Sequence, residues 1–148
     1  MFSSSCEYGL RATMYLAAIE NGDEYISIGR ISEDLDISFH FLTKTFQKMT
    51  QAGLLESQRG PSGGVRLARD PEEITLRDIV FAIDGPGLFT ECILGLPGCG
   101  DDKPCPLHNQ WATERERLVD MLEEATLDQL VHDIETLDLR LRASLPTS

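Results

Sequence analysis

The strongest constraint on the fold is a glycine-rich run at mid-chain, Arg59-Gly60-Pro61-Ser62-Gly63-Gly64. Three glycines and one proline in six residues favour a tight turn with positive φ angles. Strand-like segments flank the run, at residues 54–58 and 65–68. Two strands joined by such a turn form an antiparallel hairpin. A plain surface turn and a phosphate-binding loop are the alternatives, but the latter requires a following Gly-Lys-Ser/Thr and a helix, which are missing here.

Three segments before the hairpin have the apolar spacing of amphipathic helices: residues 3–20, 28–35 and 39–51. Ser38 is a good N-cap for the third helix, and Gly53 follows its end. The spacing predicts that its apolar side chains face inward; they are Phe39, Leu42, Phe46 and Met49. The tight turn before Ser38 makes the second and third helices a helix-turn-helix. With the hairpin as a wing (residues 54–68), the pattern predicts a winged helix-turn-helix.

Charge is distributed unevenly along the chain. The whole protein carries 13 Lys and Arg against 25 Asp and Glu, a formal net charge of −12. Residues 70–148 hold six basic and 17 acidic side chains, whereas residues 37–69 hold five basic side chains and one acidic one. An acidic body should suppress nonspecific binding to nucleic acid, and the basic segment suggests one local anionic partner. A chance cluster on a solvated face, or an adaptation to high salt, would give the same composition.

A winged helix-turn-helix binds double-stranded DNA, and the third helix and the wing therefore supply the candidate contacts. The candidates for base edges are His40, Thr43, Lys44 and Gln47. The candidates for phosphates are Ser38, Lys48 and the wing backbone at Gly60, Ser62 and Gly63. Arg59, at the base of the wing, is the candidate for a minor groove.

The rest of the chain reads as three further helices around a long loop. Residues 74–84 look helical, residues 107–124 form a long amphipathic helix, and residues 127–139 form a shorter one. We therefore expect a mainly α-helical protein with one small β-hairpin. Its parts are a DNA-binding domain (1–84), a cysteine loop (85–106) and a dimerisation segment (107–140). The long helix is expected to pair with its copy in a homodimer, the alternative being packing onto the first helix.

The cysteine loop contains Cys92, Cys99 and Cys105 in the spacing C-x6-C-x5-C, and His108 follows. Thiolates with an imidazole suit zinc, copper(I) or an iron–sulfur cluster. The loose, Gly- and Pro-rich spacing differs from the tight C-x2-C knuckles of structural zinc sites and suits a wider object such as a cluster. Zinc and a thiol/disulfide switch remain open. Cys6, on the first helix, is expected to be a small core residue.

Other classes of protein fit the sequence poorly. No apolar run approaches the roughly 18–20 residues of a membrane span, and the N-terminus lacks a signal-peptide pattern. We therefore expect a cytoplasmic protein without a membrane partner, in which cysteines are ligands or redox groups rather than disulfides. No nucleophile elbow, HExxH or nucleotide fingerprint is present, which argues against an enzyme with a small-molecule substrate.

The combination of wing, cysteine loop and long helix resembles bacterial regulators related to the iron–sulfur cluster regulator IscR and the nitric-oxide-sensing repressor NsrR. The resemblance covers residues 1–140 and includes residues 8–17 and 53–64. It implies homodimers on palindromic promoter DNA. It also implies a cluster, held by the three cysteines and a fourth ligand, that senses nitric oxide, redox stress or cluster supply. A zinc-stabilised or thiol-switch regulator, without a cluster, is the alternative.

The resemblance offers two candidates for the fourth ligand. The segment Cys105-Pro-Leu-His108 is similar to the IscR pattern, in which the histidine binds a [2Fe–2S] cluster, the favoured form. Glu7 lies near the place where NsrR-like proteins extend a carboxylate from the partner subunit to a [4Fe–4S] cluster. The chain departs from the IscR pattern by one extra residue between Cys92 and Cys99, which leaves the cluster type open.

Overall fold

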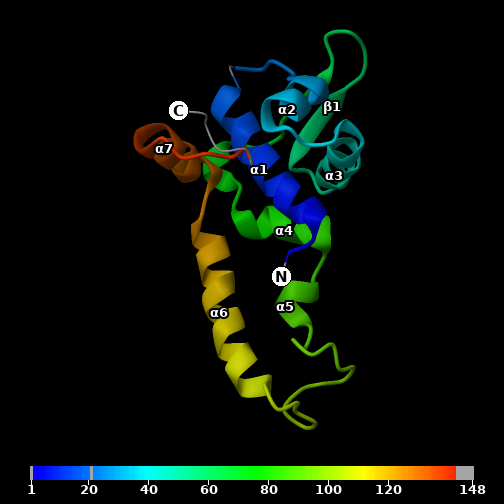
Figure 1. Ribbon diagram of the computed structural model, residues 1–148, viewed down its shortest axis with the longest axis vertical. Coiled ribbons are helices and arrows are strands. Elements are labelled where there is room, and N and C mark those ends of the chain that lie inside the picture. The colour runs from blue at the N-terminus through cyan, green and yellow to red at the C-terminus, as the bar shows by residue number, and fades with distance from the viewer. Residues whose placement is uncertain (1, 21, 143–148) are drawn as a thin grey trace.

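The computed structural model describes residues 2–20 and 22–142 and is elongated, with most helices at one end (Figure 1). The N-terminal part contains α1 (Ser4–Ile19), α2 (Ile28–Leu35), α3 (Phe39–Gln51), β1 (Leu55–Gln58) and β2 (Gly64–Leu67). A short 3-10 helix, η1 (Pro71–Glu73), leads to α4 (Leu76–Asp84) and α5 (Gly87–Thr90). After the cysteine loop come α6 (His108–Glu124) and α7 (Leu127–Leu137). The predicted class, mainly helical with one hairpin, is confirmed.

Side-chain caps explain where the N-terminal helices begin. The hydroxyl oxygens of Ser3, Ser27 and Ser38 accept hydrogen bonds from backbone N–H groups in the first turns of α1, α2 and α3. Such a cap satisfies a donor that otherwise has no partner within the helix. At α4, Thr75 and Asp78 form a reciprocal capping box, so this helix begins two residues later than the apolar pattern predicts.

The wing is an antiparallel pair in which Leu55 faces Leu67 and Gln58 faces Gly64. At its turn, the N–H of Gly63 donates to the carbonyl of Gly60 at 2.9 Å. A second attachment joins the wing to the segment before α2, where Ile26 and Val65 exchange two backbone hydrogen bonds of 2.8 Å each. The predicted hairpin is therefore confirmed, and Val65 anchors it to the segment that leads into α2.

The hydrophobic core lies where α1 packs against α3 and α4. Cys6 is fully buried there, and burial, reinforced by Asp84, raises the pKa of its thiol to about 12. The interpretation of Cys6 as a core residue is confirmed. On α3, the buried residues are Leu42, Thr45, Phe46 and Met49.

The sequence prediction was wrong for Phe39, which is 49% exposed. The buried stripe of α3 begins at Leu42, because Phe39 lies on the side of the helix that faces α2 and the wing. Thr45 joins the stripe beneath α1. The prediction also treated residues 85–106 as an unbroken loop, whereas Gly87–Thr90 forms the single turn of α5.

The two C-terminal helices take different positions. Helix α7 packs against α1, whereas α6 runs beside α4 and α5 and extends towards the cysteine loop (Figure 1). Backbone hydrogen bonds from Leu76 to Ala125 and from Leu127 to Ile74 attach the α6–α7 junction to the start of α4. Along α6 only Leu122 is buried, and Met121 is 53% exposed. Among the described residues, no helix is both long and apolar enough to cross a membrane.

Candidate functional sites

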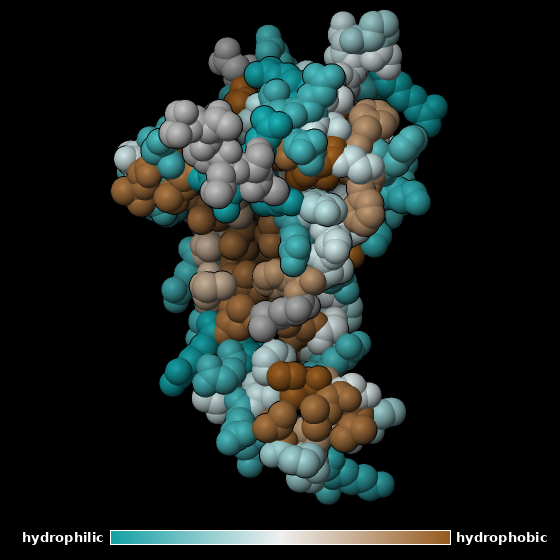
Figure 2. All heavy atoms as spheres, viewed as in Figure 1, coloured by the Kyte–Doolittle hydropathy of each residue, from teal (hydrophilic) through white to brown (hydrophobic). Residues whose placement is uncertain are grey.

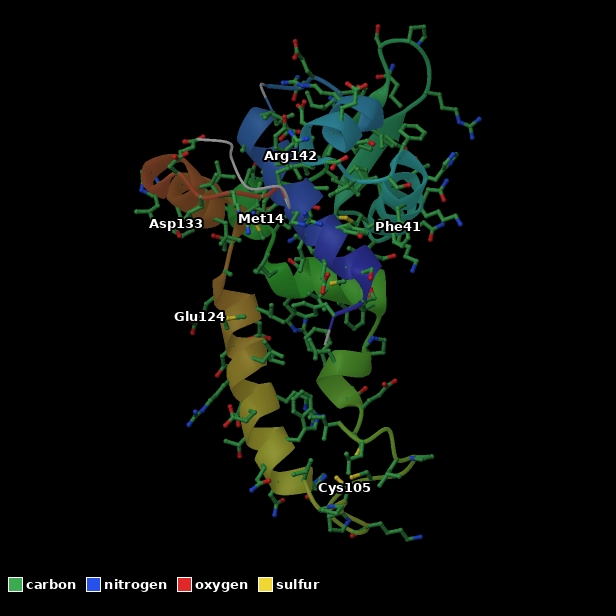
Figure 3. All side chains as sticks on the ribbon, in the orientation of Figure 1. Met14, Phe41, Cys105, Glu124, Asp133 and Arg142 are labelled. Atoms are coloured by element: carbon green, nitrogen blue, oxygen red, sulfur yellow. The ribbon has the colours of Figure 1, made fainter. Side chains whose placement is uncertain are left out.

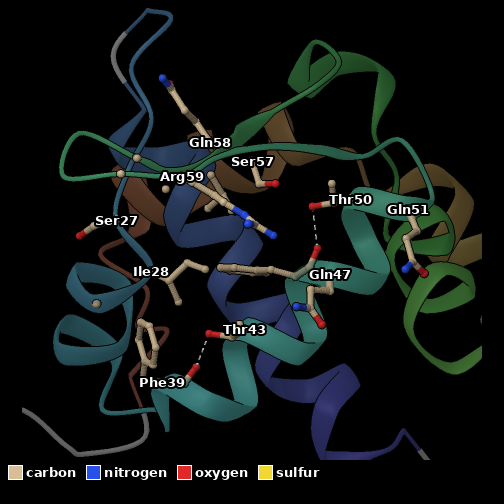
Figure 4. Close-up of a pocket in the computed structure, with 16 residues that line it drawn as sticks. Ser27, Ile28, Phe39, Thr43, Gln47, Thr50, Gln51, Ser57, Gln58 and Arg59 are labelled. Carbon is tan, nitrogen blue, oxygen red and sulfur yellow. Dashed lines mark hydrogen bonds between the residues drawn. The ribbon is translucent and has the colours of Figure 1, made fainter.

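A groove of about 730 Å³ separates α3 from the wing (Figure 4). Five of the predicted DNA-contact residues line it: Thr43, Gln47, Arg59, Gly60 and Gly63. Arg59 extends from the base of the wing over the groove, and Gln47 faces it from α3 (Figure 4). The Thr43 hydroxyl donates to the carbonyl of Phe39 at 2.8 Å, so its proton is used within the helix. Gln47 and Arg59 are both exposed and can donate to a ligand in the groove.

The other predicted contacts lie outside the lining of this groove; they are Ser38, His40, Lys44, Lys48 and Ser62. The Ser38 hydroxyl caps α3, and the Lys48 ammonium donates to the carbonyl of Ile83 at 3.3 Å, against α4. Lys44 and Ser62 are exposed. The structure thus separates the candidates into a set inside the groove and a set around its edges.

The second site lies at the opposite end of the molecule, beyond α5, where Figure 3 labels Cys105. The sulfur atoms of Cys92, Cys99 and Cys105 lie within 4.8 Å of one another, and those of Cys92 and Cys105 are 3.5 Å apart. The Cys99 sulfur is 3.4 Å from Nδ1 of His108, the first residue of α6. The loop therefore brings together the three thiols and the imidazole that the sequence singled out; we call these four residues the cysteine site.

Asp101 holds the far side of the imidazole. Its carboxylate oxygen lies 3.3 Å from Nε2 of His108, while Nδ1 faces Cys99. Metal-binding histidines commonly donate their second N–H to a carboxylate in this way, which orients the ring. Sequence reasoning missed Asp101 because nothing in its spacing distinguishes it from Asp102.

Two side chains of α6 attach the helix to the chain just before Cys92. The indole N–H of Trp111 and the guanidinium of Arg115 both donate to the carbonyl of Glu91, at 3.1 Å and 3.2 Å. Both side chains also line the small pocket around the cysteine site. Helical spacing from His108, three and seven residues on, would have indicated that they share its face.

Backbone N–H groups favour the thiolate form of Cys92. The N–H of Leu96, together with that of Leu94, lowers the pKa of the Cys92 thiol to about 7, against the opposing effect of burial. Burial raises the pKa of Cys105. The N–H of Cys105 also donates to the Cys99 sulfur at 3.4 Å. Three sulfur ligands with backbone donors and an imidazole form a donor set that suits a soft metal or an iron–sulfur cluster.

Glu7, the other candidate ligand, lies elsewhere in the chain. It is exposed in the first turn of α1, and the ligand group that the described residues form contains the three cysteines without it. Within one chain, therefore, His108 is the candidate that the fold brings to the thiols.

A helix-turn-helix with an anchored wing, joined to a thiol-rich loop and a long helix, defines a winged-helix protein. Known proteins are similar to this chain in sequence and in fold. The family model for Rrf2, described as an iron-dependent transcriptional regulator, matches residues 2–133. The transcriptional regulator IscR of Photorhabdus laumondii is 31% identical over 137 residues, 93% of this chain and 82% of that protein. IscR of Vibrio campbellii is 32% identical over 143 residues, which are 97% of this chain and 84% of that protein.

Solved structures agree with the family match. CymR, the global cysteine regulator of B. subtilis, superposes with a TM-score of 0.73 at 27% identity, covering 89% of this chain and 96% of that chain. T. potens IscR gives a TM-score of 0.73 at 25% identity, covering 95% of this chain and 92% of that chain. The chain belongs to the Rrf2 family, a family of DNA-binding transcriptional regulators rather than of enzymes.

Proposed function

We propose that this regulator is a homodimeric repressor whose affinity for a palindromic promoter is controlled by an iron–sulfur cluster bound at the cysteine site. The observation that carries the proposal is the convergence of three sulfur atoms within 4.8 Å, with His108 beside them. In this proposal the cluster senses nitric oxide, redox stress or the supply of clusters. A [2Fe–2S] cluster with His108 as fourth ligand suits these four residues. A [4Fe–4S] cluster would instead need Glu7 from the partner subunit.

The exposed surface of α6 supports the proposed dimer. Apolar atoms gather over the middle of the molecule, where α4 and α6 run side by side (Figure 2). Met121, half-exposed on α6, offers apolar surface that a second copy would bury. A two-fold dimer places two α3 helices on successive major grooves, about 34 Å apart. Because Trp111 and Arg115 tie α6 to the chain before Cys92, a change at the cysteine site reaches the helix that sets this spacing. A coupling of roughly 1–3 kcal/mol changes DNA affinity about 5- to 150-fold.

An absorption spectrum of anaerobically purified protein tests the cluster directly. We expect visible bands with bound iron and sulfide, and we expect nitric oxide to bleach the bands and change the mobility of a promoter fragment in a gel shift. A colourless protein with one zinc per chain, prepared without air, would contradict the proposal and favour a zinc-stabilised regulator. Metal-free protein that forms a Cys92–Cys105 disulfide on oxidation would favour the thiol switch, for which the 3.5 Å sulfur separation is the supporting observation.

Removing the wing arginine tests the DNA-binding half of the proposal. Arg59→Ala is expected to weaken promoter binding about 5- to 150-fold, because an arginine contact in a DNA groove contributes roughly 1–3 kcal/mol. The measurement is a titration of labelled promoter DNA at fixed salt and fixed cluster state. Lys103→Ala is the matched control, since it removes one positive charge from the distant cysteine loop and should leave affinity unchanged. Arg59→Ala protein that binds as tightly as wild type would show that the wing does not make this contact.

A further inference from the structure

The first turn of α3 presents two phenylalanines with different surroundings. Phe41 packs edge-on against Tyr8 of α1, with ring centroids 5.3 Å apart. Phe39 is 49% exposed and lines the groove between α3 and the wing, close to Ile28 of α2 (Figure 4). Fully burying a phenylalanine side chain contributes about 1.5–3 kcal/mol, so a half-exposed ring leaves part of this unused. A ligand that covers Phe39 would therefore gain affinity from it.

The position of Phe39 in the recognition helix indicates which kind of ligand would cover it. In a helix-turn-helix, the N-terminal residues of the recognition helix contact base edges in the major groove. The C5-methyl group of thymine is the apolar group of that groove, and phenylalanine is among the side chains that contact it. A phenyl ring has no hydrogen-bonding atoms, so it can distinguish thymine from cytosine only through this methyl group.

Two neighbours of Phe39 affect how polar this end of the groove is. Ile28 supplies an aliphatic wall, and the Thr43 hydroxyl is turned onto the Phe39 carbonyl. The ring of His40, which is outside the groove lining, meets the Phe39 ring edge-on, with centroids 5.9 Å apart. Polar donors lie further along the groove, at Gln47 and Arg59.

We propose that Phe39 is a specificity-determining residue that recognises thymine methyl groups in the promoter. The inference rests on the proposed binding of promoter DNA and adds an apolar contact to the polar ones already assigned. It predicts that each half-site contains thymine opposite the first turn of α3, and that the methyl group contributes to affinity independently of hydrogen bonding.

Deoxyuridine, which is thymidine without the methyl group, provides the test. A duplex is first selected from a random-sequence pool by the full-length wild-type protein. Each thymine is then replaced singly by deoxyuridine. We expect at least one replacement per half-site to weaken wild-type binding about fourfold. This is the change in affinity that corresponds to about 0.8 kcal/mol, the contribution of one buried CH2 group. Phe39→Ala should bind the thymine and uracil duplexes equally. Phe41→Ala is the matched control, because it also removes a phenyl ring, but one that packs against α1. This variant should keep the wild-type preference for thymine over uracil.

Several outcomes would overturn the assignment. One is a wild-type protein that tolerates deoxyuridine at every position, and another is a Phe39→Ala variant that keeps the methyl preference. A third outcome combines a wild-type protein without methyl preference and a Phe39→Ala variant whose mass in solution is lower than that of the wild type. This outcome would assign the exposed ring to self-association instead. Failure of the wild-type protein to select any duplex would reject DNA binding itself, which distinguishes failure of the proposed function from failure of the methyl contact alone.

Discussion

Cys105→Ser is expected to abolish cluster binding, with loss of the visible absorption bands and of bound iron and sulfide. Cys105 is the most buried of the three thiols in the cysteine site, and its sulfur lies 3.5 Å from that of Cys92. A serine hydroxyl is nearly isosteric but is a harder and far less acidic ligand, so it is a poor replacement for a thiolate on iron. Iron and sulfide per chain, measured on anaerobically purified protein, are the primary readout.

Tryptophan fluorescence gives an independent readout of the same variant. Trp111 is the only tryptophan of the chain, and it lines the pocket around the cysteine site. A bound cluster absorbs at the wavelengths of indole emission, so loaded wild-type protein should be dimmer than Cys105→Ser. Cys6→Ala is the matched control: it also removes one thiol, but from the core, and should retain iron and quenching. A Cys105→Ser variant with wild-type iron content would show that Cys105 is not a cluster ligand.

Gly64→Ala is expected to destabilise the protein by about 2–4 kcal/mol and to detach the wing from the segment before α2. Gly64 has a φ of +148°, and a Cβ placed there would lie 2.0 Å from the carbonyl oxygen of Ile26. The Ile26–Val65 hydrogen bonds would have to open to admit it. Because these bonds position Arg59 over the groove, promoter binding should fall as well.

Gly60→Ala separates the effect of close contact from that of backbone conformation. Gly60 also has a positive φ, +106°, but a Cβ there meets nothing within 4 Å. This variant should lose only about 1–2 kcal/mol, the cost of a left-handed conformation for a non-glycine residue. Urea unfolding of both variants and wild type, in the same cluster state, measures the difference. Equal losses would mean that the contact with Ile26 carries no energy and that the wing is not anchored as described.

Short-range patterns were sufficient to predict most of the secondary structure. The wing turn followed from glycines and a proline, and the start of α3 followed from Ser38. These features depend on backbone conformations and hydrogen bonds that close within a few residues, and the chain records them locally. The burial of Phe39 was predicted incorrectly, because helical spacing places a residue on a face but does not say which neighbouring element covers that face.

The cysteine site shows the same division. The candidate ligands were visible in the sequence, because three thiols and an imidazole within 17 residues are a chemical signal that needs no fold. Asp101, which orients the imidazole, and the Trp111 and Arg115 bonds to the Glu91 carbonyl were not visible. These contacts depend on how the cysteine loop returns to the start of α6. Contacts between residues that are distant in the sequence produce no periodic pattern that could predict them.

By itself, then, the sequence determined the class of this protein: helices, caps, the glycine turn of the wing, the local excess of positive charge in residues 37–69, and the soft ligands of one loop. Each of these depends on the chemistry of neighbouring residues. Only the tertiary structure decided which side chains share a site. It placed Arg59 and Gln47 across one groove with Phe39 exposed at its end, and it joined the cysteine site to α6 through one carbonyl. Those arrangements arise because packing of α1 against α3 and α4 sets where each helix and loop ends in space.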